Sequence, residues 1–254
     1  MSNLEEIAKK EVLLNDSEIF SIDFENKKYW LKKARPTKPN KIQKFFYKFF
    51  PFELLIPSSA KNAFETLEYE TQKLQKFKAL GINTANIAYK CDDFFVLEDC
   101  GRTMHSLMRK NISEEAFYEY VDLILEELSK IHKNGLFHGG AQTRNFTYKD
   151  GAIFVIDLEE SFDSSISVET LQFRDFLLFL LSFLKIKSNF QINYEYIINK
   201  YMSLTGNSKT KERLNKMANK ISILIYLSEM RIFQNMLGSD VKSFFKLFKI
   251  LKTL

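Results

Sequence analysis

A polar loop followed by a short hairpin constrains the fold of this chain more than any other stretch. The loop is 138-HGGAQTRN-145, and its first His and last Asn are seven residues apart. The segment that follows, 146-FTYKDGAIFVID-157, turns at Asp150-Gly151, a pair that favours a tight hairpin turn. The second strand of this hairpin is apolar and ends in Asp157. A polar loop and an acidic residue are therefore expected to meet at one place in the fold.

The segments before this loop alternate between strand and helix patterns. Alternating residues predict a hairpin of two strands over 18–24 and 27–33, and two further strands over 85–90 and 93–101. Helical spacing predicts a helix over 59–81 between the two pairs. The predicted buried side of this helix consists of Ala63, Phe64, Leu67, Leu74, Phe77 and Leu80.

Helical patterns dominate the second half of the chain, over 114–135 and again from Thr170 onward. The apolar run at 176–184 is too short to span a bilayer and predicts a buried helix. A linker-like stretch follows Gly101. This order predicts an α+β chain with a mixed first lobe over 1–100 and a mainly helical second lobe over 101–254.

The order of elements and the spacing of the loop resemble the protein-kinase-like superfamily. Within it, the chain most resembles the small atypical bacterial kinases that phosphorylate sugars of the lipopolysaccharide core. The resemblance covers residues 15 to 185 and implies a two-lobe, protein-kinase-like fold. It assigns a catalytic-type loop to 138–145 and a metal-site hairpin to 146–157, with ATP and Mg²⁺ as the implied cofactors.

The resemblance implies three roles in the first lobe. Lys32, with Lys33 as the alternative, would bind the phosphates of the nucleotide. Glu70, with Glu68 as a competitor, would pair with this lysine and orient it. The backbone from Glu98 to Cys100 would hydrogen-bond the nucleotide base.

The resemblance also implies two roles in the second lobe. Asn145 and Asp157 would hold the metal ion, because Mg²⁺ prefers hard oxygen ligands. Asp175 lies in a strongly apolar run and would anchor the backbone of the loop, with Arg174 as an alternative partner for this acid.

The chain departs from the family pattern at two places. The first glycine is Gly81, so the usual Gly-rich cover over the phosphates is missing, although residues 15–17 could form a different turn there. The second departure is Gly140, at the position where the family has the Asp that accepts the proton of the acceptor hydroxyl. A general base is typically worth ~10²–10⁴ in rate.

Other side chains are candidates to act in place of that Asp. Gln142 could orient a hydroxyl group but could not remove its proton. His138, Glu159 and Glu160 could serve as bases if they point into the cleft, although His138 is more often structural in this fold. The predicted catalytic positions are therefore His138, Gly140 and Gln142.

Basic residues are concentrated in one part of this chain, whose net charge is +5. Nine Lys and Arg residues and no acidic residue lie between Asn26 and Phe52. Within this part, 36–57 predicts a short basic amphipathic helix, with apolar positions at Ile42, Phe45, Phe46, Phe49 and Phe50. Such a segment favours an anionic glycan, a lipopolysaccharide precursor or, through 38–50, a membrane surface. No nucleic-acid recognition motif accompanies it.

Two hypotheses for the function follow. In the first, the chain transfers phosphate from Mg-ATP to a hydroxyl group of a lipopolysaccharide or surface-glycan sugar, with transfer of AMP as a minor variant. In the second, it is a pseudokinase that acts as a regulatory or assembly partner, with or without bound nucleotide. Cys91 and Cys100 lack metal-binding spacing, and no secretory signal pattern is found. The predicted location is the cytoplasm, with the inner face of the inner membrane as the favoured contact.

Overall fold

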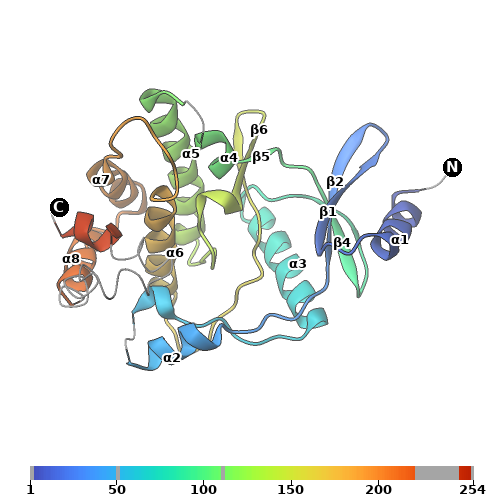
Figure 1. The fold of residues 1–254 in the computed structure, drawn as a ribbon, viewed down its shortest axis with the longest axis horizontal. Helices are drawn as coiled ribbons and strands as arrows, with labels where there is room; N and C mark the ends of the chain where they lie inside the picture. Colours follow the sequence, from blue (N-terminus) through green and yellow to red (C-terminus); the bar gives the residue numbers. More distant parts are fainter. Residues whose placement is uncertain (1–2, 50–51, 110–111, 221–245, 253–254) are drawn as a thin grey trace, which may run out of the picture.

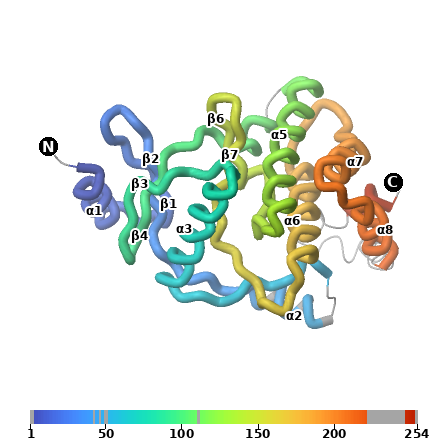
Figure 2. The backbone as a smooth tube through the Cα atoms, turned by 180° about the vertical axis from the view of Figure 1, so that it is seen from behind, coloured from blue at the N-terminus to red at the C-terminus, as the bar shows by residue number. Residues whose placement is uncertain are grey.

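A β-sheet and a group of helices form two parts of the molecule, with one long helix between them (Figures 1 and 2). The computed structural model describes residues 3–49, 52–109, 112–220 and 246–252. The predicted α+β architecture, a sheet-containing lobe followed by a helical lobe, is confirmed.

The sheet of the first lobe is antiparallel and has the strand order β1-β2-β4-β3. β1 (Ile19–Phe24) and β2 (Lys27–Lys33) form the predicted hairpin, and β3 (Ile87–Lys90) and β4 (Phe94–Glu98) complete the sheet. The turn between β1 and β2 places Asn26 at a φ of 59°, a conformation that Asn tolerates better than most residues.

Two helices accompany this sheet. α1 (Leu4–Leu14), which the sequence patterns did not predict, contacts β1 and β2 and buries Ala8 in a small core with residues of the sheet. α3 (Ala63–Ala79) begins with an Asn62 capping box and matches the predicted helix. The prediction that Phe64 and Leu80 are buried was wrong: they are 49% and 43% exposed, because they lie at the two ends of the helix.

The basic segment between β2 and α3 contains two short helices, α2 (Lys41–Phe49) and η1 (Glu53–Leu55). η1 contacts α6 (Val168–Phe183) of the helical half, and Leu54 is buried there with its core. Of the predicted apolar positions, Phe45 is 61% exposed, and Phe50 lies outside the described residues. The division of the chain at residue 100 stays a prediction.

The stretch after Gly101 is more ordered than a linker. β5 (Arg102–Thr103) pairs with β6 (Phe146–Lys149), which pairs with β7 (Ala152–Val155) in a second, three-stranded sheet. α4 (Met104–Met108) follows β5 directly, and the hydroxyl of Thr103 caps it. Two fully buried methionines, Met104 and Met108, hold this short helix against the core, a signal too brief to show as periodicity in the sequence.

The helical lobe is built from α5 (Glu114–Lys133), α6, α7 (Tyr194–Thr205) and α8 (Thr210–Lys220). α6 contains the apolar run at 176–184 and is buried along most of its length, as predicted. Among the described residues, no helix is long and apolar enough to cross a membrane. Figures 1 and 2 both show α3 between the first sheet and this group of helices, where side chains from both lobes can meet.

Candidate functional site

The amine of Lys32, on β2, lies among three carboxylates. Its Nζ is 2.8 Å from Glu70 Oε2, 3.1 Å from Asp157 Oδ1 and 2.9 Å from Glu159 Oε2. Burial alone would lower the pKa of Lys32, but the three carboxylates outweigh burial and raise it. The lysine is therefore a permanent cation that joins α3 to the residues after β7.

The structure distinguishes the two candidate lysines and the two candidate glutamates. Lys33 points to the opposite face of β2, where its Nζ donates to the backbone oxygen of Asn15. Glu68 lies on the outer side of α3 and pairs with Lys90 at 2.5 Å. Lys32 and Glu70 are thus the pair that the fold brings together, and they are 7% and 2% exposed.

The turn suggested over residues 15–17 lies just before β1, and its Asn15 backbone oxygen accepts a hydrogen bond from Lys33. The backbone N–H of Ser17 donates to Asn15 Oδ1 at 3.1 Å, which closes a local turn before β1. Ile19, the first residue of β1, is paired with Lys32 across the sheet. Since Ile19 also lines the cleft, this turn is a candidate substitute for the missing Gly-rich loop.

Asp157 follows β7 by two residues and has a φ of 62°, which turns its carboxylate toward Lys32. Burial raises its pKa, but the charge of Lys32 and its hydrogen bond outweigh burial, so the net shift is downward. The carboxylate is 40% exposed and lines the cleft, so it stays ionised and accessible to a ligand.

Asn145 ends η2 (Thr143–Asn145), a short turn that the loop makes before β6. Its Nδ2 donates to the backbone oxygen of Gly140 at 2.8 Å, which leaves the amide oxygen as the atom suited to a metal ion. No three His, Cys, Asp or Glu side chains gather as a metal site in the part of the chain that the structure describes. Two oxygen ligands fit Mg²⁺, which usually takes one or two protein ligands plus phosphate and water.

Asp175 of α6 anchors the loop, as expected. Its carboxylate accepts hydrogen bonds from the backbone N–H groups of His138, at 2.6 Å, and Gly139, at 2.9 Å. Arg174 instead donates to the backbone oxygen of Gly139 and pairs with Glu160 at 3.1 Å. The buried acid therefore fixes the loop through its backbone, and the neighbouring arginine fixes the segment after Asp157.

Gly139 is a position where only glycine fits. Its φ is +100°, and a Cβ atom there would lie 3.0 Å from the Cβ of Glu160. Glycine thus permits the loop and the segment after Asp157 to approach each other.

A residue that the sequence analysis missed, Lys73, supports the loop from the other side. Its buried Nζ donates to the backbone oxygen of His138 at 2.8 Å, and burial lowers the pKa of Lys73 to about 7. It follows Glu70 by three positions on α3, so the two residues share one face of the helix. This spacing was visible in the sequence.

Three of the suggested substitutes for the missing Asp, namely His138, Glu159 and Glu160, are committed to other contacts. His138 is fully buried, its Nδ1 accepts from the Gly140 N–H at 3.2 Å, and burial lowers its pKa to about 4. Glu159 pairs with Lys32 and with Arg35, at 2.7 Å, and Glu160 pairs with Arg174. Gln142 is half-buried, and its backbone N–H donates to Gly140.

A cleft of about 320 Å³ runs from Lys32 to the connection between the lobes. Its apolar lining residues include Trp30, Ala85, Leu97 and Ile156. At its far end, the N–H of Glu98 already donates to Asn86. Within the described residues, the N–H of Cys100 has no hydrogen-bond partner, and the Cys100 thiol donates to the Glu98 oxygen at 3.6 Å. Both residues line the cleft.

Comparisons with known proteins add limited detail. No family model matches the chain. An "uncharacterized protein" from Haemophilus influenzae is 26% identical over 236 residues, which cover 92% of this chain and 90% of that protein.

Among solved structures, a MAP kinase from Leishmania major has a TM-score of 0.40 and 11% identity over 78% of this chain, which spans 65% of that kinase. A gentamicin–APH(2")-IIa complex has a TM-score of 0.44 and 11% identity, over 98% of this chain and 99% of the other. A streptomycin–ATP–APH(2")-IIa complex has a TM-score of 0.41 and 10% identity, with 98% and 97% covered.

Proposed function

We propose that this protein is a phosphotransferase that binds Mg-ATP between its lobes and phosphorylates a hydroxyl group of an acceptor. The observation that carries the proposal is the position of Lys32 between Glu70 and Asp157, at the end of a cleft that Asn145 also lines. A protein with a purely structural role has no need for two oxygen ligands and a buried cation around one cleft.

The residues of the cleft fit a nucleoside triphosphate and its metal ion. Lys32 would bind the phosphates, and Asn145 and Asp157 would hold the metal through their oxygen atoms. Mg-ATP, when bound, supplies the phosphoryl group and neutralises the charge that develops on it. The apolar walls and the backbone of Glu98 and Cys100 would hold the base.

The chain's own residues contribute mainly by positioning. Asp175 and Lys73 hold the loop from opposite sides, and Asn145 ties the loop to itself through Gly140. Phosphoryl transfer relies largely on orientation and charge, so a fixed loop contributes even without a base at position 140. Removal of the hydroxyl proton would then occur late, without help from a side chain at this position.

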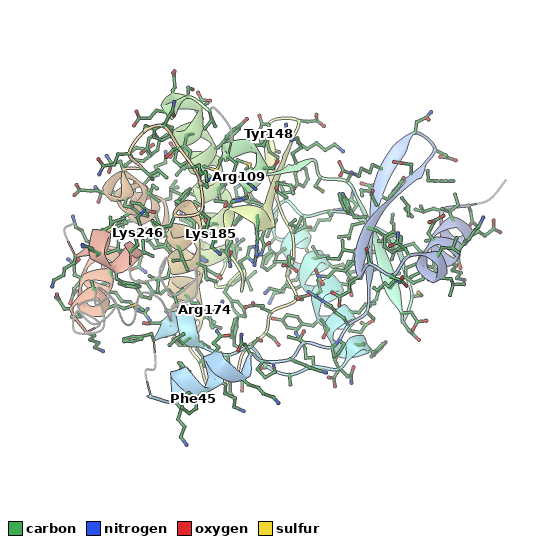
Figure 3. All side chains as sticks on the ribbon, viewed as in Figure 1. Phe45, Arg109, Tyr148, Arg174, Lys185 and Lys246 are labelled. Carbon is green, nitrogen blue, oxygen red and sulfur yellow. The ribbon has the colours of Figure 1, made fainter. Side chains whose placement is uncertain are left out.

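The proposed acceptor is a sugar hydroxyl of lipopolysaccharide or of another surface glycan. The support is the basic segment that contains α2, in which Lys41, Lys44 and Lys48 are exposed together with Phe45, at the edge of the molecule (Figure 3). Such a helix suits peripheral contact with an anionic membrane, where each basic residue contributes about 1 kcal/mol. Binding to vesicles with and without anionic lipid, for the wild-type chain and Phe45→Ser, tests this contact.

Thermal unfolding with ATP and Mg²⁺ tests the nucleotide site. We expect a metal-dependent rise of the melting temperature, because a ligand that binds only the native state stabilises it. The rise should be absent in Asp157→Ala and retained in Glu68→Gln, a charge removal on the outer side of α3. The absence of any rise at millimolar ATP would contradict the proposal.

The second candidate function is that of a pseudokinase, which binds a partner and transfers nothing. Gly140 favours it, together with the commitment of His138, Glu159 and Glu160 to other contacts. The two functions differ in turnover. Saturable nucleotide binding without transfer of labelled phosphate to lipopolysaccharide precursors or to water would favour the pseudokinase.

A further inference from the structure

A group of basic side chains lies beside the catalytic-type loop 138–145. Arg144 belongs to η2 and immediately precedes Asn145, and Arg109 is the C-cap residue of α4. Both side chains are exposed. His105, on α4, lies beside the loop, with its Nδ1 3.5 Å from the hydroxyl of Thr143.

The fold places these cations near His105. α4 packs against η2, the turn that contains Arg144, and Arg109 follows His105 by four residues at the end of α4. Burial lowers the pKa of His105, and the charges of Arg109, Arg144 and Lys185 lower it further. No carboxylate is among the groups that shift it. The charges of both arginines therefore act on one imidazole.

The described carboxylates do not neutralise the two arginines. Neither Arg109 nor Arg144 forms an ion pair with any acidic residue in the described ranges. This contrasts with Arg35 and Arg174, whose guanidinium groups both pair with glutamates. Exposed arginines without a protein partner are suited to bind phosphate or carboxylate in a two-pronged geometry.

The group adjoins the cleft. Thr103 lines the cleft and also caps α4, so His105 lies only two residues from the cleft wall. Arg144 is adjacent to Asn145, one of the proposed metal ligands. In addition, Gly140 provides no carboxylate on the acceptor side of the loop, where a negative charge would repel an anion approaching Arg144.

We propose that Arg109, Arg144 and His105 form an anion subsite that binds a phosphate or carboxylate group of the acceptor sugar. The identity of the ligand as an acceptor rests on the proposed phosphotransferase function, whereas anion binding itself does not. The subsite would select acceptors that are already negatively charged. It would also place the hydroxyl to be phosphorylated near Asn145 and Asp157.

The three histidines of the chain make this proposal testable by NMR without nucleotide or metal. His132 and His138 are buried, and the resonance of His105 is identified by its loss in His105→Asn. The pKa of His105 is followed while glucose 6-phosphate, glucuronate or uncharged glucose is added at constant ionic strength. We expect the two anions, and not glucose, to raise this pKa in a saturable way, and the stronger of the two identifies the preferred group.

The variants decide whether the arginines are responsible. Arg109→Ala and Arg144→Ala should each weaken anion binding about tenfold, as expected for the loss of one charge-assisted contact. Lys216→Ala, which removes an exposed positive charge on α8, should leave binding unchanged. Equal effects of KCl and the anions, equal binding by the arginine variants, or no shift at all would overturn the proposal. A positive result together with no response to Mg-ATP would reject the proposed function and retain the subsite.

Discussion

The two sides of the catalytic-type loop differ in how their charges are balanced. On the nucleotide side, Lys32 is surrounded by Glu70, Asp157 and Glu159 within 3.1 Å. On the other side, Arg109 and Arg144 have no carboxylate partner among the described residues, and Gly140 removes the acid expected there. On the first side, the buried cation is already paired with carboxylates of the protein. On the second side, the exposed arginines are available to bind an anion from outside the protein.

The comparison teaches that loss of the loop Asp need not mean loss of the whole site. The residues proposed to bind nucleotide and metal lie around one buried cation, and Asp175 anchors the loop. Apart from the missing Gly-rich loop, the difference lies on the side where an acceptor would bind. A negatively charged acceptor would thus explain why glycine, and not Asp, occupies position 140.

Removal of the buried cation should have the largest effect. Lys32→Met leaves three carboxylates without their shared partner, and the loss of one member of a buried ion pair typically costs ~3–5 kcal/mol. We expect this loss in the free energy of unfolding measured with urea. Lys33→Met is the matched control, because its amine lies on the opposite face of β2 and should change stability far less. Equal losses in the two variants would contradict the assignment.

The next prediction concerns the acceptor side of the loop, where Gly140→Asp restores the missing acid. Gly140→Asp should raise transfer of phosphate to water or to an uncharged sugar by ~10², if a base is what the loop lacks. The backbone of Gly140 is not among the glycines with positive φ, and a Cβ atom there would lie 3.2 Å from Asn145 Nδ2, so a small local shift suffices. The rate of labelled phosphate release measures the effect. No gain in a folded variant that still binds nucleotide would favour the pseudokinase.

Glu159 should compete with the nucleotide for cations. Its carboxylate contacts both Lys32 and Arg35, the positions where phosphate charge would be bound. Glu159→Gln should therefore tighten nucleotide binding by about tenfold, equal to ~1.4 kcal/mol, measured by calorimetry. Glu18→Gln is the control, since Glu18 contacts Arg35 at 2.6 Å but does not contact Lys32. Weaker binding in Glu159→Gln would show that this carboxylate instead helps to hold the metal.

The last expected effect is a dependence of stability on pH. Burial lowers the pKa of Lys73 from its ordinary value of 10.5 to about 7. Between these values the unfolded chain binds one more proton than the folded chain, so this lysine makes stability rise with pH, by up to about 1.4 kcal/mol per unit. The difference in unfolding free energy between the wild-type chain and Lys73→Met, measured from pH 7 to 9, should grow in favour of the wild type. A constant difference would rule out this titration.

The sequence predicted the parts of this site that depend on short spacings. The interval from His138 to Asn145, the Asp150-Gly151 turn and the apolar strand before Asp157 are local patterns, and the structure keeps them together. The choice of Lys32 over Lys33 could not be made from the sequence, because it depends on which face of β2 the rest of the molecule covers.

Other features depend on contacts between distant segments. Nothing near Glu159 or Glu160 in the sequence shows that Lys32, Arg35 and Arg174 neutralise them. The basic group around His105 was missed for the same reason, since α4 was taken for part of a linker and Arg144 is a single residue in the loop. Tertiary packing of α4 against η2 makes them neighbours.

α3 contacts both halves of the site, the sheet on one side and the loop of the helical lobe on the other. Glu70 binds the lysine of the sheet, and Lys73, one turn further, binds the backbone of the loop in the helical lobe. A swing of α3 that separated Lys32 from Glu70 would also pull Lys73 out of its buried contact with the loop. Such a movement would break both contacts at once, the Lys32–Glu70 ion pair and the hydrogen bond from Lys73 to His138. We therefore expect α3 to keep this position.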